Sequence, residues 1–335
     1  MAGLPEHERR TDRLHGYPTD NRRGVTETCD HPGTTTAKSR QVVDAELAQI
    51  RVRLLEYLSG DPGRRPLGGI GIFHCRQAQA LRNVPILQPV AVLVASGRKI
   101  IALGERRIEV SPGELLLLPG GSTVEIGNHP GRRGEPYLGL AMAFPQESIA
   151  QFRLSYGPTI PSDTPPLWHA PAPRDMAAAM AQWIEWCLRH PVDTTLARHR
   201  QVEILLLLAR AGIAGNLLLN RAASWRERVT QLIALDPARD WSDSEVCRRL
   251  GIGESTLRRH LKAEESGFRQ VLEECRMAAG LALLQETFWP VSQVAEAVGY
   301  TSHSRFSSRF KRRFGLSPTD LKRSRESKAA QKSSS

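Results

Sequence analysis

The chain has 335 residues, of which 40% are apolar and 24% charged, and it carries a formal net charge of +11. This length accommodates about two domains, and the composition is that of a soluble globular protein. Its five cysteines are widely spaced and form no CxxC pair, so they indicate neither a disulfide framework nor a zinc site, and they fit a reducing cytoplasm.

The sequence gives no sign of export or of a membrane span. Its N-terminus lacks the apolar core of a signal peptide, and the most apolar run, from Glu203, is interrupted by Arg210 and Asn216. The basic charge is concentrated near the end, where 20 Lys/Arg face 14 Asp/Glu after residue 223. A charge of +6 in the last third favours a polyanionic partner.

The first elements in chain order are a tail and a helix. Residues 1–39 are rich in Arg, Asp, Thr, Gly and Pro and lack a periodic apolar pattern, so we predict disorder there, as we do for residues 325–335. Between residues 41 and 58 apolar side chains recur at helical spacing, until Gly60-Asp61-Pro62-Gly63 ends the pattern. One amphipathic helix is therefore predicted after the tail.

Residues 70–144 consist of short apolar runs such as VAVLVA, IIAL and LLLL, separated by the turn sequences SGRK, GE and SPGE. This punctuation is typical of antiparallel β-structure and predicts a small barrel or sandwich. From residue 174 helical spacing returns, breaks at His190-Pro191 and resumes to about residue 211. The chain is predicted to be helical almost throughout from Trp225, which makes the fold class α+β with two domains.

The last third begins with a helix-turn-helix pattern. Ser242 and Glu245 have the spacing of a capping box, and Gly251 is placed to end the helix in a left-handed turn. A second helix is expected from about residue 254, with Leu257 and Leu261 facing inward. A single pattern of this kind is weak evidence for DNA binding, since glycine-joined helices occur in many cores.

The pattern recurs, with Gly299 at the turn and one extra residue before the next helix. Phe306, Phe310 and Phe314 then follow at intervals of four and form one stripe, while basic residues occupy the opposite face. We expect the stripe to anchor this helix to its own three-helix core. Two copies, with Leu257 and Phe306 49 positions apart, strongly favour DNA binding.

A long helix from Phe268 is predicted to join the two units. Its 19 residues span about 28 Å at 1.5 Å per residue, while successive major-groove faces lie roughly 34 Å apart. A rigid connection of this length could place both second helices, at about residues 254–263 and 302–313, in successive major grooves.

The segments LGIGESTLRRHLK and VAEAVGYTSHSRFSSRFKRRFG, with the closing Leu316-Ser317-Pro318, resemble the DNA-binding domain of AraC/XylS-type transcription regulators. The resemblance implies a sequence-specific DNA-binding regulator with a domain at residues 224–324. The sequence departs from the family pattern at Gly253, where a capping Ser is usual, at Gly280, where Ala is usual, and at Ser308, where Arg is frequent. Gly280 is expected to cost on the order of 1 kcal/mol of helix stability.

Residues 40–222 resemble, more weakly, the cupin-like effector-binding and dimerisation domain of the same family. The segment VASGRKIIALGERRIEVSPGELLLLPGG is similar to hairpins that wall an effector pocket. The His-x-His cluster of metal-binding cupins is missing, and His74 and His129 are expected to be surface or core residues and not ligands. No metal or other cofactor is therefore expected.

The strands suit a pocket for an apolar effector, and neighbouring cations suit a carboxylate on that effector. The pocket is predicted to be lined by the apolar residues Val90, Val92, Val94, Ile100, Ile108, Leu116 and Leu118. The cations that the turns are expected to offer are Arg98, Lys99, Arg106 and Arg107.

The exposed faces of the two second helices carry the candidate DNA contacts. Arg pairs with guanine O6 and N7, and Ser and His make single contacts to bases or phosphates. Base reading is assigned to Ser255, Arg258, Arg259, His303, Ser304, Arg305 and Ser307. Phosphate contacts are assigned to Lys262, Arg309, Lys311 and Arg312, and Ser308 is a further candidate contact.

The expected partners are double-stranded promoter or operator DNA, a small-molecule effector, and RNA polymerase if the protein is an activator. A homodimer through the helices between residues 174 and 211 is possible. Two alternatives stay open, namely a cupin-type enzyme, which bound metal would favour, and an architectural DNA binder, which equal affinity for all sequences would favour. The expectation is that the chain is not an enzyme.

Overall fold

The computed structural model describes residues 37–59, 69–157, 166–191, 193–219 and 224–326. The predicted tails lie mostly outside these residues. Where they overlap with them, the prediction is wrong, because residues 37–39 are already helical and Arg325 is buried. All the described residues belong to one compact unit.

The predicted first helix is confirmed as α1 (Ala37–Ser59). Leu47, Ile50 and Leu54 recur at intervals of three and four and are buried on one face. This face packs against helix α3 (Arg174–Arg189) and strand β3 (Val90–Ser96). The N-terminal helix is therefore part of the core of the β-rich half.

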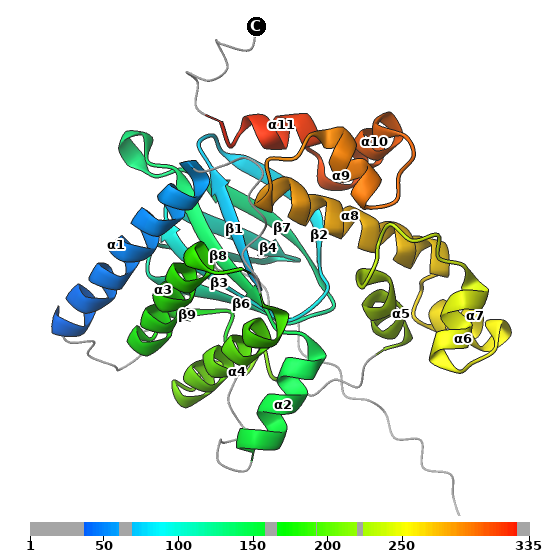
Figure 1. Cartoon of the computed structure of the whole chain (residues 1–335), viewed down its shortest axis with the longest axis horizontal. Helices are drawn as coiled ribbons and strands as arrows, with labels where there is room; N and C mark the ends of the chain where they lie inside the picture. Colours follow the sequence, from blue (N-terminus) through cyan, green and yellow to red (C-terminus); the bar gives the residue numbers. More distant parts are fainter. Residues whose placement is uncertain (1–36, 60–68, 158–165, 192, 220–223, 327–335) are drawn as a thin grey trace, which may run out of the picture. The chain divides into compact units, whose positions relative to one another are not determined.

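The β-rich half consists of two antiparallel sheets (Figure 1). One has the strand order β1-β8-β3-β6-β9 and the other the order β2-β7-β4-β5. The remaining strands are β1 (Ile70–Cys75), β2 (Gln79–Ile86), β4 (Arg98–Leu103), β5 (Arg106–Val110), β6 (Glu114–Leu118), β7 (Ser122–His129), β8 (Tyr137–Ala143) and β9 (His169–Pro171). The predicted succession of short strands over residues 70–144 is confirmed.

One turn shows why the punctuating residues are needed. Gly97 joins β3 to β4 with a φ of 73°, a conformation that favours glycine. A β-carbon at this position would lie 2.4 Å from the carbonyl oxygen of His129. Only glycine therefore lets β3 turn so closely beside β7.

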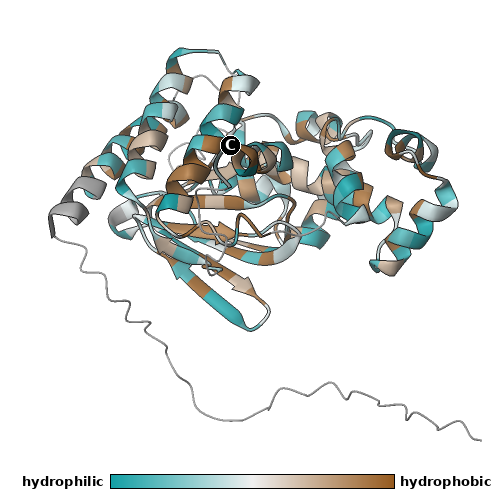
Figure 2. Cartoon of the chain, turned by 90° about the horizontal axis from the view of Figure 1, so that it is seen from below, coloured by the Kyte–Doolittle hydropathy of each residue, from teal (hydrophilic) through white to brown (hydrophobic). Residues whose placement is uncertain are grey.

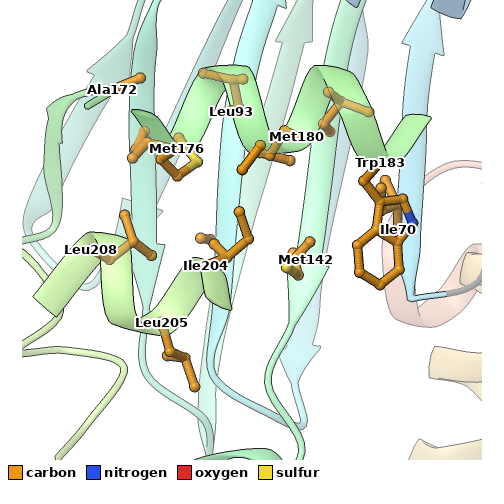
Figure 3. Packing of buried hydrophobic residues seen from close by; sticks show 14 of the residues in the cluster. Ile70, Leu93, Met142, Ala172, Met176, Met180, Trp183, Ile204, Leu205 and Leu208 are labelled. Atoms are coloured by element: carbon orange, nitrogen blue, oxygen red, sulfur yellow. The ribbon is translucent and has the colours of Figure 1, made fainter. Parts of the chain in front are cut away.

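Helices α3 and α4 (Thr194–Arg210) cover the five-stranded sheet, and both were predicted. Figure 3 shows Met176 and Met180 of α3 pointing toward Leu93 of the sheet, with Ile204 of α4 beside them. These side chains belong to one buried cluster that also includes residues of α1. A further helix, α2 (Gln146–Tyr156), packs against α4 and was not predicted.

The last third is helical, as predicted, so the fold class is confirmed. Figure 2 shows hydrophobic and hydrophilic stretches alternating along these helices, as amphipathic helices require. The helices are α5 (Trp225–Ala234), α6 (Asp243–Leu250), α7 (Glu254–Ala263), α8 (Phe268–Glu286), α9 (Val291–Ala297), α10 (His303–Phe314) and α11 (Pro318–Arg323).

The two helix-turn-helix units belong to different hydrophobic clusters. Leu257 and Leu261 of α7 belong to a cluster built only from α5–α8 and the loop residue Trp241. Phe306 and Phe310 of α10 belong to a cluster that also contains strand residues such as Leu81. The phenylalanine stripe therefore packs against neighbouring helices, as expected, and its cluster also extends to the strands.

The capping box predicted at Ser242 is only half formed. Ser242 accepts a hydrogen bond from the backbone N–H of Glu245, as expected. The Glu245 carboxylate, however, accepts hydrogen bonds from Arg248, Arg249 and Arg239, and these arginines, Arg248 above all, hold its pKa down at about 2. A complete capping box begins α5, where Ser224 and Glu227 exchange both bonds.

Candidate nucleic-acid interface and adjoining cavity

Helix α7 presents the first set of candidate contacts. It begins after Gly251, whose φ of 67° makes the predicted left-handed turn. Gly253 is its N-cap residue and supplies no side-chain bond, while Leu257 and Leu261 are buried. This packing leaves the four predicted residues of the first unit exposed, namely Ser255, Arg258, Arg259 and Lys262.

Helix α10 presents the second set. Its N-cap residue Ser302 accepts a hydrogen bond from the backbone N–H of Arg305, and its three phenylalanines are fully buried. Six predicted contacts are exposed, namely His303, Ser304, Arg305, Ser308, Lys311 and Arg312. Ser307 and Arg309 are only partly exposed.

The partial burial of Arg309 has a specific cause. Its guanidinium forms an ion pair with the carboxylate of Glu273 on α8. The next carboxylate on α8, Glu274, lies 3.6 Å from Nη1 of Arg313 and also pairs with Arg226 of α5. Two neighbouring acids of the linker helix therefore hold both units, and Arg309 would have to leave Glu273 to reach a phosphate.

Gly280 is placed where the linker helix α8 meets the second unit. A β-carbon at this position of α8 would lie 2.8 and 2.9 Å from two ring atoms of Phe306. Real β-carbons do not approach so closely in a packed core. The departure from the usual Ala therefore has a packing reason, because it admits the Phe306 ring.

Arg276 anchors the linker helix to the first unit. Its Nε and Nη2 donate hydrogen bonds of 3.0 Å to the carbonyl oxygens of Pro237 and Arg239, respectively. Its Nη2 also lies 2.8 Å from where a β-carbon of Gly299 would stand. The sequence placed Arg276 in the linker helix but gave no sign of this role.

A cavity of about 660 Å³ lies between the β-sheets and helices α5 and α8. Of the predicted pocket residues, Val90, Val92, Leu116, Leu118 and Lys99 line it. The other predicted lining residues and cations do not, namely Val94, Ile100, Ile108, Arg98, Arg106 and Arg107. The helical part of the wall, which includes Thr230, Ala278, Leu281 and Glu286, was not predicted.

The predicted cations that do not line the cavity interact with other side chains. Arg98 forms an exposed ion pair with Glu109 at 3.1 Å, and the Arg106 guanidinium lies 5.4 Å from the centre of the Trp168 ring. Lys99 was expected in a turn, but it is the second residue of β4 and is only 2% exposed. The strand alternation that points Ile101 inward points Lys99 inward too.

The ammonium of Lys99 is therefore an unusual charge in an apolar wall. Its Nζ donates a 2.7 Å hydrogen bond to Oδ1 of Asn128 and lies 5.4 Å from the ring centres of both Phe73 and Tyr137. Within the described part of the chain, no carboxylate oxygen lies within 4.0 Å of this nitrogen. Burial lowers the pKa of Lys99 from 10.5 to about 7.

Glu286 contributes an acid to the same cavity from the end of α8. Its Oε1 would lie 2.7 Å from a β-carbon at Gly71, so the carboxyl group rests on the bare backbone of β1. Burial raises the pKa of Glu286 to about 7, although the nearby Arg325 opposes the shift. The cavity thus holds a base and an acid that both titrate near neutral pH.

The described residues contain no group of three or more His, Cys, Asp or Glu side chains placed to hold a metal ion. His74 is 8% exposed, and burial lowers its pKa to about 3. His129 of β7 lies opposite Arg98 in the register with β4, and it is partly exposed. No helix in the described part of the chain is long and apolar enough to cross a bilayer.

Two family models match the chain. One, described as the AraC-type transcriptional regulator N-terminus, matches residues 66–213, and another, described as a helix-turn-helix domain, matches residues 246–324. The chain thus combines an AraC-type N-terminal domain with a helix-turn-helix domain. The second match includes α7 and α10, and therefore every candidate DNA contact of this AraC-type chain.

The curated relatives match part of the chain. The AraC-type chain is 37% identical over 98 residues to the transcriptional regulator SirC of Salmonella typhimurium strain SL1344. This stretch is 29% of the chain and 33% of SirC, so the chain spans about a third of the length of that relative.

Solved structures of ToxT from Vibrio cholerae strain SCE256 resemble the fold over most of its length. An apo variant of ToxT has a TM-score of 0.56 at 12% identity, and covers 77% of this chain and 97% of that one. Wild-type ToxT bound to an unsaturated fatty acid has a TM-score of 0.53 at 13% identity, with coverages of 78% and 97%. Both β-rich and helical parts of this AraC-type chain thus occur together in a known architecture.

Proposed function

We propose that this protein is a sequence-specific DNA-binding transcription regulator whose cavity holds a small apolar carboxylate as effector. In this proposal α7 and α10 enter successive major grooves, residues 224–324 form the DNA-binding domain, and residues 40–222 form the effector domain. The observation that carries the proposal is that α7 and α10, in the two units joined by α8, both have a buried apolar face and an exposed basic face.

The chemistry of the two exposed faces supports DNA as the partner. Arg258, Arg259 and Arg305 have the fork of donors that pairs with guanine, and Lys311 supplies a point charge for a phosphate. The relative SirC is itself named a transcriptional regulator.

Lys99 supports a carboxylate as the effector. An ammonium that is buried without an anionic partner is costly, and a bound carboxylate would remove that cost. The surrounding Val90, Leu116 and Leu118 provide an apolar wall for the rest of the molecule. A volume of about 660 Å³ suits a small organic ligand, and the fatty acid bound to ToxT is a molecule of this type.

Selection of DNA from a random library by the full chain tests the first half of the proposal. We expect a consensus with two half-sites about one helical turn apart, and tight binding of that consensus in a gel-shift assay. The double variant Arg258→Ala/Arg305→Ala is the matched control, since both residues are exposed and their loss should spare the fold. If the DNA molecules selected from the library share no consensus sequence, the result would favour the architectural DNA binder instead.

Thermal melting of the full chain with oleate, a representative unsaturated fatty acid, tests the second half. A ligand present at a hundred times its Kd stabilises the folded state by about 2.7 kcal/mol. We expect oleate to raise the Tm of the wild type and to have far less effect on Lys99→Met. Oleyl alcohol, which lacks the carboxylate, is the matched ligand control, and a chelator should change neither result.

Two further partners belong to the proposal. RNA polymerase is expected if DNA binding activates transcription, and a second copy of the chain is expected to dock through α3 and α4. No enzymatic reaction is assigned to the chain, and its relatives are regulators.

A further inference from the structure

Four buried side chains form a continuous series of hydrogen bonds from the cavity to the end of the last helix. Lys99 Nζ donates to Asn128 Oδ1 at 2.7 Å, and Asn128 Nδ2 donates to Gln79 Oε1 at 3.0 Å. Gln79 Nε2 then donates to Oγ of Ser324, just beyond α11, at 2.8 Å. We name these residues the Lys99–Ser324 chain, and their exposures are only 1 to 5%.

The strand register explains how the series is built. Asn128 of β7 lies directly opposite Lys99 of β4 on one side and directly opposite Gln79 of β2 on the other. Residues paired in this way across neighbouring strands project from the same face of the sheet and are close enough for their side chains to interact. The Lys99–Ser324 chain therefore crosses the three adjacent strands β4, β7 and β2 before it reaches the end of α11.

The direction of every bond in the series is fixed by its first member. The ammonium form of lysine has only donors, so Asn128 must present its oxygen to Lys99 and its NH2 group to Gln79. Gln79 must then present its NH2 group to Ser324, whose own hydroxyl donates to the carbonyl oxygen of Leu321 at 2.6 Å. The ammonium at the cavity thus sets the orientation of the amide that holds the last helix.

Ser324 is also where the second helix-turn-helix unit contacts the β-rich half. Its carbonyl oxygen accepts hydrogen bonds from the backbone N–H groups of Arg76 at 2.8 Å and Gln77 at 3.1 Å. The neighbouring Arg325 donates to the carbonyl oxygen of Thr287, at the end of α8, at 2.6 Å. A change at Ser324 would therefore reach the junction of β1, β2, α8 and α11.

We propose that the Lys99–Ser324 chain couples occupation of the cavity to the hold of the β-rich half on the second helix-turn-helix unit. The proposal rests on the proposed function, because it takes an anionic ligand at Lys99 as the signal. A carboxylate beside Nζ keeps the nitrogen a full ammonium and so keeps the charge-assisted bond to Asn128, which is stronger than a neutral one. Ligand binding therefore tightens the contact at Ser324, and α10 and α11 stay on the β-rich half.

A variant that removes the ammonium tests the coupling without a ligand. In Lys99→Met, Oδ1 of Asn128 loses its donor, and the amides of Asn128 and Gln79 lose their fixed orientation. The amide protons of Arg76 and Gln77 report on the far end, because both donate to Ser324. Hydrogen exchange of these two amides in the full chain should become roughly 5- to 30-fold faster, the effect of losing one or two buried hydrogen bonds.

Asn83→Ala is the matched control. Asn83 also joins β2 to the second unit, because its Nδ2 donates to the carbonyl oxygen of Arg313 at 3.3 Å, but it lies outside the Lys99–Ser324 chain. Its loss should leave exchange at Arg76 and Gln77 at the wild-type rate. Faster exchange confined to β4 and β7 in Lys99→Met would overturn the coupling, as would an equal effect of Asn83→Ala.

A second arm uses oleate and the variant Gln79→Met, which breaks the chain outside the cavity. Oleate should slow exchange at residues 321–326 in the wild type, and should bind Gln79→Met without slowing it. Ser324→Ala should behave like Gln79→Met, and it replaces that variant should the latter not fold. Equal slowing in wild type and variants would show that the signal takes another route and would overturn the proposal. If oleate does not bind the wild type, the carboxylate effector is wrong, while the Lys99→Met arm still decides the coupling.

Discussion

The ring of Phe306 occupies the space that a side chain at Gly280 would need. A β-carbon there would lie 2.8 Å from one ring atom, and Phe306 is fully buried, so the ring has little room to move away. This contact joins the linker helix α8 to α10 of the second unit. It therefore fixes how far α10 stands from α8.

Gly280→Ala should destabilise the protein although it improves helix propensity. The propensity gain is about 1 kcal/mol, while overpacking a buried site typically costs about 1 to 3 kcal/mol. We expect a net loss of unfolding free energy in urea denaturation of the full chain. Combining Gly280→Ala with Phe306→Leu should recover part of the loss, because the smaller side chain makes room for the methyl group.

Gly253→Ser is the control for Gly280→Ala. No atom lies within 4 Å of a β-carbon at Gly253, and its extended backbone (φ −78°) suits a capping serine. The expected gain is a few tenths of a kcal/mol. A stabilisation by Gly280→Ala as large as that of an unhindered glycine would contradict the packing account.

Lys311→Ala and Arg305→Ala should affect DNA binding in different ways. Loss of the Lys311 charge should weaken consensus and random DNA alike and lower the slope of log K against log salt by about 1. Loss of Arg305 should cost about 1 to 3 kcal/mol mainly on the consensus site. Fluorescence anisotropy at several salt concentrations measures both, and equal effects of the two changes on all sequences would remove Arg305 from base reading.

Arg309→Ala should act mainly on stability. Its guanidinium pairs with Glu273, and breaking the pair leaves a partly buried carboxylate without its cation. We expect a lower Tm, and we expect Glu273→Gln to lower the Tm similarly, with the double variant showing less than the sum. If Arg309→Ala instead weakens DNA binding at unchanged Tm, Arg309 is a phosphate contact as first assigned from the sequence.

Local sequence patterns predicted most of the helices and strands of the fold. Helical spacing located α1, α3 and α4, and glycine punctuation located the strands, because burial of one face leaves a period in the sequence. Helix α2 was missed because only Ser148, Ile149 and Phe152 of its 11 residues are buried, too few to establish a period. The repeated helix-turn-helix pattern also located α7 and α10, because the leucines and phenylalanines of their buried faces recur at helical spacing.

Features that depend on contacts between distant segments could not be predicted from local sequence patterns. The bond between Gln79 and Ser324 joins residues 245 positions apart, and the cavity wall from α8 also faces strands that are distant in the sequence, so no local pattern exists for either. One local signal was available, since Lys99 alternates in phase with the apolar Ile101 and so had to point inward. The assignment of Lys99 to a turn overlooked it.

The affinity for oleate should fall as the pH rises through 7. Lys99 has its pKa lowered to about 7 by burial, so it is charged below that pH and increasingly neutral above it. Glu286, with its pKa raised to about 7, is neutral below that pH and becomes an anion above it. Both changes disfavour a bound carboxylate.

The other titratable groups near Lys99 do not change charge in this range. Burial raises the pKa of the Cys75 thiol to about 12 and raises the pKa of the Tyr137 hydroxyl as well, so both stay neutral. Arg325, beside Glu286, has its pKa lowered to about 10 by burial and stays charged. The loss of affinity is therefore assigned to Lys99 and Glu286 alone.

Calorimetric titration of the full chain with a short, soluble apolar carboxylate such as octanoate measures this dependence between about pH 6 and pH 9, where a carboxyl group of ordinary pKa stays ionised. Each group contributes at most about tenfold per pH unit above its pKa, and binding should take up protons near pH 7 to 8. Glu286→Gln should keep the Lys99 part of the slope, and Lys99→Met should keep only the Glu286 part at a weaker affinity throughout. An affinity that is flat across this range, or that rises with pH, would contradict the placement of the carboxylate at Lys99.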